Sequence, residues 1–232
     1  MLSAQPPRDT VRNENPPAIR PAELADAAAI ARVSVDAFPD LFRSLYGRAG
    51  VPSIVAAHAA LFDAGILEAA RYRVATVASG IVGVCALNTT GEIGAPDFRP
   101  ILKTVRRHMW LPAAFRAAIG ISTTLAVVPR RIPYEPDLLY IEALAVDSQH
   151  RSRGIGTALL RHAAATAAAA GRGRLALHVM RDNDRACELY RRFGFVDWED
   201  PPQLQWLARD SRLMILTIQP HHILEPAGSA HR

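Results

Sequence analysis

Residues 139–160 read LYIEALAVDSQHRSRGIGTALL, and this stretch decides the fold class. It begins as an apolar run, passes through a polar turn with two glycines, and ends in a second apolar run. The pattern predicts a buried strand over 138–146 and a helix from Ile155 to Ala170 that stops before Gly171. A strand that enters a helix through a short turn is the first half of a parallel β-α-β unit.

The turn in this stretch has the composition of an anion-binding loop. Gly154 and Gly156 lack a Cβ atom, so a phosphate can approach the backbone closely. The first N–H groups of the following helix have no partner within it and lie at the positive end of its dipole. The alternative is that the glycines form only a turn. A dinucleotide fingerprint is excluded because Leu159 stands where it needs a small residue, and a P-loop is excluded because the only lysine is Lys103.

Outward from this stretch, strands alternate with helices. Ser79-Gly80 predicts a hairpin turn, Ser53 is expected to cap a helix, and Asp182 or Asn183 another. The first helix is expected to carry Leu24, Ala28 and Val35 along one side. The expected strands are 18–20, 72–78, 81–88, 138–146, 175–180, 195–198 and 213–218, and the expected helices are 21–37, 53–69, 155–170 and one that ends at Gly194.

These elements predict an α/β protein with a mixed sheet that contains one parallel β-α-β unit. We expect a single domain over 18–218, with a helical insert at about 95–137 in which Pro112 opens a helix. The insert lies between the third and fourth strands. The proline-rich segment 1–17 is expected to be disordered, and 219–232 to be a flexible tail.

A second signature follows at 183–195, which reads NDRACELYRRFGF. Together with Arg151-Ser-Arg-Gly-Ile-Gly156, it resembles the two linked motifs of the GCN5-related N-acetyltransferase (GNAT) superfamily, Gln/Arg-x-x-Gly-x-Gly/Ala and N-x-x-A-x-x-x-Y-x-x-x-G-F. The resemblance implies the GNAT fold. It also implies an acetyl-CoA-dependent N-acetyltransferase in which a primary amine attacks the donor directly in a ternary complex. A catalytically silent acyl-CoA-binding sensor or scaffold is the alternative.

The resemblance also assigns the residues that bind acetyl-CoA. Backbone N–H groups of the loop should hold the pyrophosphate, main-chain groups of the strand end should pair with the pantetheine arm, and Asn183 should bind close by. The side chains of Arg151 and Arg153 are candidates for the phosphates because guanidinium groups suit them, the alternative being a solvated turn. The implied cofactor-binding residues are Leu144, Ala145, Val146, Arg151, Ser152, Arg153, Gly154, Ile155, Gly156, Thr157 and Asn183.

Two side chains are candidates for proton transfer. Tyr190 matches the general acid of the family, with a core tyrosine as the alternative. Glu142 is the candidate base because a carboxylate in an apolar strand is uncommon, and we expect it to share a side with Leu144 and Val146. A structural salt bridge or a substrate-positioning role is the alternative for Glu142. Direct transfer is expected rather than a covalent route through Cys187.

Composition restricts the partners. The two cysteines form no pair motif, residues 1–17 are no secretory signal, and no apolar run is long enough to span a bilayer, so a cytoplasmic protein without a membrane partner is expected. The histidines lack metal-ligand spacing, so no metal is expected. The acceptor is a small-molecule or peptide amine of unknown identity, and a homodimer is possible.

The formal charge of +5 is unevenly distributed. Residues 150–192 hold nine arginines and three acids, and residues 99–131 hold one lysine and six arginines without an acid. The phosphates of CoA account for the first group, so no nucleic-acid partner is expected. For the second group, Arg106 and Arg107 are expected to border the acceptor pocket or the phosphate end of the cofactor, unless they form a solvated face.

Overall fold

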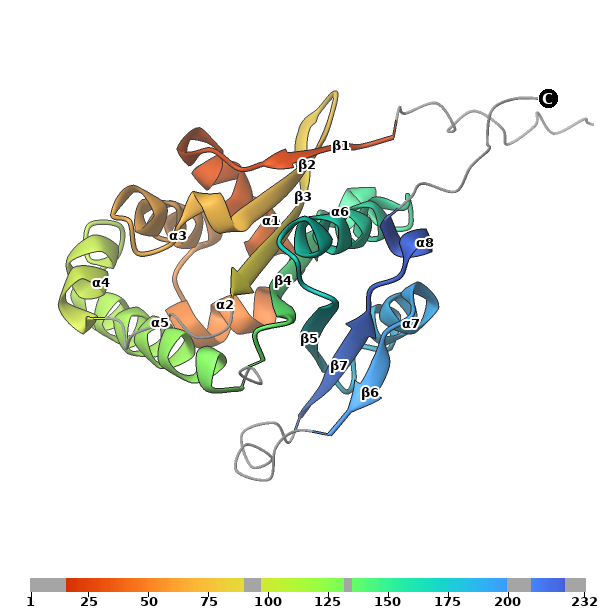
Figure 1. The fold of residues 1–232 in the computed structure, drawn as a ribbon. Helices are drawn as coiled ribbons and strands as arrows, with labels where there is room; N and C mark the ends of the chain where they lie inside the picture. Colours follow the sequence, from red (N-terminus) through yellow and green to blue (C-terminus); the bar gives the residue numbers. More distant parts are fainter. Residues whose placement is uncertain (1–15, 90–96, 132–134, 200–209, 224–232) are drawn as a thin grey trace, which may run out of the picture.

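The computed structural model describes residues 16–89, 97–131, 135–199 and 210–223. Within these residues, seven strands form one twisted sheet in the order β1-β2-β3-β4-β5-β7-β6 (Figure 1). Neighbouring strands are antiparallel except for the parallel pair β4 and β5, which confirms the expected mixed sheet. The strands are β1 Ala18–Pro21, β2 Tyr72–Val77, β3 Gly80–Thr89, β4 Leu138–Val146, β5 Arg174–Met180, β6 Val196–Trp198 and β7 Ser211–Thr217.

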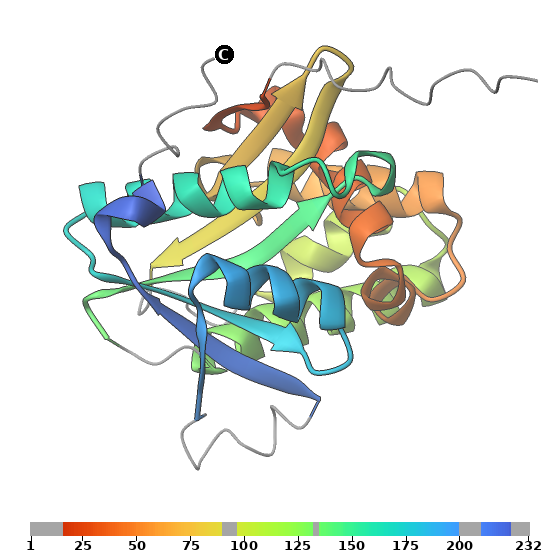
Figure 2. The same ribbon diagram turned by 90° about the vertical axis from the view of Figure 1, so that its right-hand side faces the viewer.

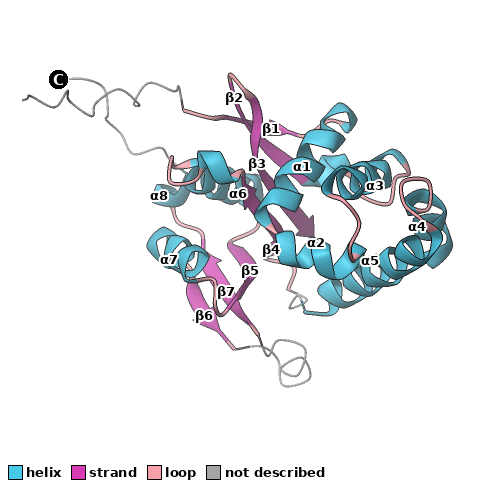
Figure 3. Ribbon diagram, turned by 180° about the vertical axis from the view of Figure 1, so that it is seen from behind, coloured by secondary structure: helices cyan, strands magenta, loops and turns pink. Residues whose placement is uncertain are grey.

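Helices cover both faces of the sheet (Figure 3). Side chains of α6 and α7 pack with β3, β4, β5 and β7 on one face, and side chains of α1 and α3 pack with β2, β3 and β4 on the other. None of the described helices is long and apolar enough to cross a membrane. The α-helices are α1 Ala27–Ala37, α2 Pro39–Tyr46, α3 Val51–Asp63, α4 Phe98–Val105, α5 Leu111–Arg131, α6 Ile155–Ala169, α7 Asp184–Phe193 and α8 Pro220–Ile223.

The insert contributes to a separate hydrophobic cluster. Side chains of α2, α3, α4 and α5 share this cluster, in which Tyr46, Leu61 and Ile101 are almost completely buried. Pro112 lies in the first turn of α5, as expected for a helix start. The ends of the insert at 90–96 and 132–134 lie outside the described residues.

Several local predictions were wrong. The helix expected to start at Ser53 begins at Val51 with Pro52 in its first turn, and α2 was not predicted. Leu24 and Ala28 are exposed, whereas Ile30 and Val33 are buried, because α1 begins only at Ala27 after a 3₁₀ turn that rotates the buried face.

The expected flexible tail is also partly wrong. Residues 220–223 form α8, which packs beside α6 (Figures 1 and 2). The His222 ring is buried and lies 5.5 Å from the Phe193 ring, and its Nδ1 accepts a hydrogen bond of 2.9 Å from the Gln219 N–H. The domain therefore extends at least to Ile223. Residues 1–15 and 224–232 lie outside the described residues.

A bulge interrupts β4 at Glu142. Ala86 of β3 is paired with Ala143, and the next residue, Leu87, is paired with Ile141, so no residue of β3 is paired with Glu142. Beyond the extra residue, the side chains that face α6 are those of even-numbered instead of odd-numbered residues. Leu139 and Ile141 pack on the α6 side before the bulge, and Leu144 and Val146 pack on that side after it.

Gly83 of β3 allows α6 to lie close to the sheet. A Cβ atom at this position would lie 2.8 Å from Ile155 Cγ2 and 3.1 Å from both Ala75 Cβ and Leu159 Cδ1. We therefore expect Gly83→Ala to lower the free energy of unfolding by about 1–3 kcal/mol through overpacking. Denaturant unfolding measures the loss.

A matched control is Gly50→Ala, because a Cβ atom there would meet only Pro52 Cδ at 3.9 Å. This change at the start of α3 is expected to cost about 1 kcal/mol or less, since Gly50 has an ordinary backbone conformation and makes no side-chain cap. Equal stability of Gly83→Ala and the unchanged protein would show that α6 tolerates the displacement.

Candidate active site

Residues of α6 and α7 line a cavity of about 680 Å³. The loop that leads into α6 lies at one end, and α8 lies at the other. Four arginines and three histidines line the cavity, and its described lining contains no carboxylate. The lining residues are Ala37, Phe38, Leu144, Val146, His150, Arg151, Ser152, Gly154, Ile155, Gly156, Thr157, Arg161, Asn183, Arg185, Ala186, Leu189, Tyr190, Arg192, Phe193, His221 and His222.

The loop that leads into α6 adopts the conformation of an anion-binding turn. Ser152 and Gly154 have positive φ angles of 64° and 81°. Gly154 is the N-cap of α6, and no side chain caps the first turn of that helix. Positive φ angles at alternate positions turn successive N–H groups toward one side, and the N-terminus of α6 adds its dipole. The loop can therefore bind a phosphate group through its backbone.

Residues of α1 fix this loop in place. The Asp36 carboxylate accepts hydrogen bonds from the Ser148 N–H at 2.7 Å and from the Ser148 hydroxyl at 3.1 Å. Arg32 donates to the Asp147 carboxylate at 3.0 Å. These contacts join segments more than 100 residues apart, and the sequence carried no signal for them.

The gap between β4 and β5 forms the inner wall of the site. The two strands pair only from Leu138 to Ile141 on β4 and then separate. The Asp147 N–H donates to the Val82 carbonyl of β3 at 2.9 Å. Because every second residue of an antiparallel strand faces its partner strand, the main-chain groups of residues 143 and 145 also face β3. Leu144 and Val146 turn theirs toward the gap, as expected.

Ala145 does not belong with them. Its main chain faces β3, and its side chain is 1% exposed in the cluster on the α1 side. The geometry does not favour the prediction that Ala145 binds the cofactor, because the ladder alternates and only every second residue faces the gap. The Val146 carbonyl, in turn, accepts a hydrogen bond of 3.1 Å from Arg151 Nε.

Comparison with known proteins identifies the family. The model of the acetyltransferase (GNAT) family matches residues 81–195, from β3 to the end of α7. The chain belongs to the GNAT family. Streptothricin acetyltransferase from Streptomyces lavendulae is 47% identical to this GNAT protein over 58 residues. That match covers 25% of this chain and about a third of the relative, 31% of its length.

Solved structures show the same fold. A histone acetyltransferase HPA2 and related acetyltransferase from Corynebacterium glutamicum is 25% identical, with a TM-score of 0.53, and the match covers 89% of this chain and 99% of that one. An N-acetyltransferase from Staphylococcus aureus is 20% identical, with a TM-score of 0.57, and covers 86% of this chain and 100% of that one.

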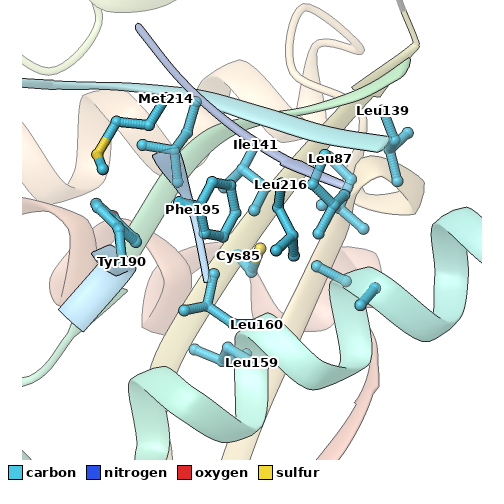
Figure 4. Packing of buried hydrophobic residues seen from close by; sticks show 14 of the residues in the cluster. Cys85, Leu87, Leu139, Ile141, Leu159, Leu160, Tyr190, Phe195, Met214 and Leu216 are labelled. Carbon is cyan, nitrogen blue, oxygen red and sulfur yellow. The ribbon is translucent and has the colours of Figure 1, made fainter. Parts of the chain in front are cut away.

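In this GNAT protein, Tyr190 of α7 lies where the cavity meets the core. It lines the cavity, and its ring lies 5.7 Å from that of Phe195 (Figure 4). Burial raises the pKa of Tyr190 far above its ordinary value, and the nearby thiol groups of Cys85 and Cys187 raise it further. The hydroxyl therefore remains protonated at any working pH and can act as a donor.

Glu142 lies on the other face of the sheet. The bulge turns it away from Leu144 and Val146, so the expected shared side was wrong. Burial raises the pKa of Tyr72, which packs against Phe62 of α3, and the nearby charge of Glu142 raises it further. Solvent reaches the residue, yet protein surrounds the carboxyl group closely enough to raise its pKa above the ordinary value, while the charge of Arg71 opposes this shift.

The alternative roles of Glu142 can be compared with the contacts. Arg71 is held by two hydrogen bonds of 3.0 Å from its guanidinium to Glu68 and by one of 3.3 Å to the Asn88 side-chain oxygen. Its ion-pair partner is thus Glu68. Among the described residues no ion pair to Glu142 is found, so the geometry does not favour a structural salt bridge.

Of the remaining predicted residues, Asn183 lines the cavity, whereas Arg153 and Cys187 do not. Asn183 lines the cavity and caps α7, because its side-chain oxygen accepts a 3.1 Å hydrogen bond from the Ala186 N–H. Arg153 is exposed and is not among the lining residues. Cys187 is buried, and its thiol donates to the Met180 carbonyl at 3.7 Å, which leaves it unsuited to nucleophilic attack.

Sequence reasoning missed three lining arginines, Arg161, Arg185 and Arg192. Arg185 donates a 2.9 Å hydrogen bond to the Ser152 hydroxyl and so joins α7 to the loop. A signal was present, because residues 185, 189 and 192 share one helical face. Arg106 and Arg107 are exposed, and no described residue of the insert lines the cavity, so these two arginines do not border it.

Proposed function

We propose that the chain is an N-acetyltransferase that takes the acetyl group from acetyl-CoA and transfers it directly to a primary amine. One observation carries this proposal: the cavity joins a cationic, phosphate-binding loop to a gap between two parallel strands where main-chain groups face outward. A long ligand with an anionic end and an amide-containing arm fits both features. CoA is such a ligand.

The residues present fit CoA on steric grounds as well. A Cβ atom at Gly154 would meet nothing within 4 Å, so the loop leaves open space over its backbone. At Gly156, a Cβ atom would lie 3.1 Å from Leu189 Cδ2, so glycine keeps the passage between α6 and α7 open. Ser152 to Thr157 would hold the pyrophosphate, and Leu144 and Val146 would pair with the arm.

The donor, when bound, supplies an acetyl thioester, and the side chains of this chain manage the protons. Glu142 accepts a proton from the attacking amine, for which its raised pKa suits it better than a carboxylate of ordinary pKa. The raised pKa keeps the Tyr190 hydroxyl protonated until the thioester bond breaks, and the hydroxyl then donates its proton to the departing sulfur. Because Glu142 and Tyr190 approach the gap from opposite faces, acceptor and donor are proposed to enter from opposite faces as well.

An acetyl-transfer assay tests the proposal. The purified chain is mixed with acetyl-CoA and single acceptors, and released CoA is measured with a thiol reagent. The panel contains streptothricin, chosen because of the partial relative, with a polyamine, an aminoglycoside and a peptide with a free N-terminus. We expect release above background with at least one amine and loss of that release with its N-acetylated form.

The opposite outcome favours a silent acyl-CoA-binding module. It is recognised by tight binding of acetyl-CoA, no release with any acceptor, and no effect of Tyr190→Phe on either measurement. An acceptor that reacts without a basic nitrogen would refute the amine part of the proposal while leaving acyl transfer intact.

A further inference from the structure

Helix α5 of the insert exposes large apolar side chains. Trp110, directly before the helix, is 73% exposed, and Leu111, its first residue, is 64% exposed. Phe115 and Ile119 follow at intervals of four residues, so they lie on the same helical face as Leu111, and each is about half exposed. Together these four side chains form a continuous apolar strip, the α5 surface.

The buried face of α5 is built from smaller side chains. Ala114, Ala117 and Ala118 are completely buried in the helical cluster, together with Ile121. A helix at the surface of a globular protein normally turns its large apolar residues toward the core and its polar residues toward solvent. The first half of α5 is instead apolar on both faces. Packing among the described residues leaves the α5 surface uncovered, and exposed apolar patches of this kind mark interaction sites.

Basic side chains border the α5 surface. Lys103 lies in the last turn of α4, Arg106 caps that helix, and Arg107 follows it; all three are exposed. Arg107 precedes Trp110 by three residues, a length of chain that spans at most about 11 Å. Since residues 99–131 contain no acid, these cations have no counter-charge within the insert sequence.

The two helices of the insert lie side by side, away from α6 and α7 (Figures 1 and 3). The ring of Phe98 in α4 lies 5.5 Å from the ring of Phe115 in α5. No residue of the α5 surface lines the cavity between α6 and α7. A partner on the α5 surface would therefore use residues that the proposed acetyl transfer does not.

We propose that the α5 surface and its basic border dock the protein onto an anionic phospholipid surface. Charge and polarity are complementary: anionic headgroups face the arginines and the lysine, and the acyl region takes up the apolar strip, with Trp110 at the interface. The expectation of no membrane partner rested on the lack of a spanning segment. Docking in the plane of a membrane surface needs none.

Two other occupants fit the α5 surface less well. In a dimer with two-fold symmetry the same patch would meet itself, which would bring the basic borders of the two copies together without an acid to separate them. Single-stranded nucleic acid would pair with the arginines and stack on Trp110, but it would leave the aliphatic side chains of Leu111 and Ile119 without a partner. A phospholipid surface satisfies both kinds of side chain.

Co-sedimentation of the full chain with lipid vesicles tests the docking. We expect at least about 10-fold tighter binding to vesicles of mixed phosphatidylcholine and phosphatidylserine than to phosphatidylcholine alone, since each basic residue near an anionic surface contributes about fivefold. Arg106→Gln with Arg107→Gln should remove most of this difference. Trp110→Ser with Leu111→Ser should weaken binding to the mixed vesicles by at least about 10-fold, because less apolar area leaves water.

Matched controls lie outside the insert. Trp198→Ser replaces another exposed tryptophan, on β6, and Arg181→Gln with Arg191→Gln removes two exposed charges from the other basic segment. Both controls should bind vesicles like the unchanged protein. Calorimetry with CoA on every variant shows whether the cavity is intact, so that a failure of the proposed function is recognised separately.

Three results would overturn the docking proposal. The first is equal binding to both kinds of vesicle, and the second is unchanged binding by Trp110→Ser with Leu111→Ser. The third is a different occupant. A dimer in analytical ultracentrifugation that this variant dissociates would assign the surface to a second copy, and tighter binding to a single-stranded oligonucleotide than to the mixed vesicles, lost in the Arg106 and Arg107 variant, would assign it to nucleic acid.

Discussion

Replacing Glu142 by glutamine is expected to lower kcat/KM by about 10²- to 10⁴-fold at neutral pH, the usual contribution of a general base. Glutamine keeps the size and hydrogen-bonding groups of the side chain but cannot accept the proton. Because Glu142 is the unpaired residue of a bulge and is reached by solvent, the change should leave the fold intact. Steady-state kinetics with the best acceptor measures the loss, and thermal unfolding verifies the fold.

The pH profile separates a base from a positioning group. Burial raises the pKa of Glu142, so the kcat/KM of the unchanged enzyme should fall as the pH decreases through this raised value and the carboxylate becomes protonated. Glu142→Gln should lose that dependence and follow only the acceptor amine, whose pKa lies near 10. The deficit should therefore shrink as pH rises.

Asp63→Asn serves as the control, because it makes a similar change at an exposed carboxylate at the end of α3. It should leave kcat/KM unchanged. A Glu142→Gln variant with a uniform loss at every pH would indicate that the residue positions the acceptor and does not accept its proton.

Replacing Tyr190 by phenylalanine is expected to lower kcat by about 10²-fold or more while leaving CoA affinity nearly unchanged. Phenylalanine keeps the ring contact with Phe195 and the packing shown in Figure 4, so only the hydroxyl is lost. The reason for the loss is that the thiolate must depart without a proton donor. Single-turnover kinetics measures the chemical step, and calorimetry measures CoA binding.

Tyr46→Phe is the matched control, because Tyr46 is also a buried tyrosine but lies in the helical cluster, with its hydroxyl 3.2 Å from His58 Nδ1. It should reduce stability without changing kcat. Normal turnover by Tyr190→Phe would mean that Tyr190 is only a core residue.

Local patterns predicted the central part of the fold well. β4 was predicted with its observed ends and α6 to within one residue, and the observed cap of α7, Asn183, is one of the two residues predicted for it, because apolar runs, glycines and caps act over a few neighbouring residues. Prediction failed for the face of α1 and the start of α3, where a 3₁₀ turn and a proline shift the helix by a few residues.

The candidate site was predicted unevenly for the same reason. The loop residues and Tyr190 come from two local motifs, and the structure places all of them except Arg153 around one cavity. The side on which Glu142 lies was mispredicted, because a bulge depends on the pairing of β4 with β3 and cannot be read from β4 alone. That the main chain of Ala145 faces β3 was not foreseen either, because hydrogen-bond direction also depends on the partner strand.

Local sequence patterns were sufficient to predict the GNAT fold, since the strand, loop and helix of 139–160 and the helix of 183–195 each follow from neighbouring residues. The tertiary structure was needed to establish which faces Glu142 and Tyr190 occupy and that arginines of α6 and α7 line the same cavity as the loop. These placements depend on strand register and helix packing between distant segments. A cavity exists only once those segments have come together.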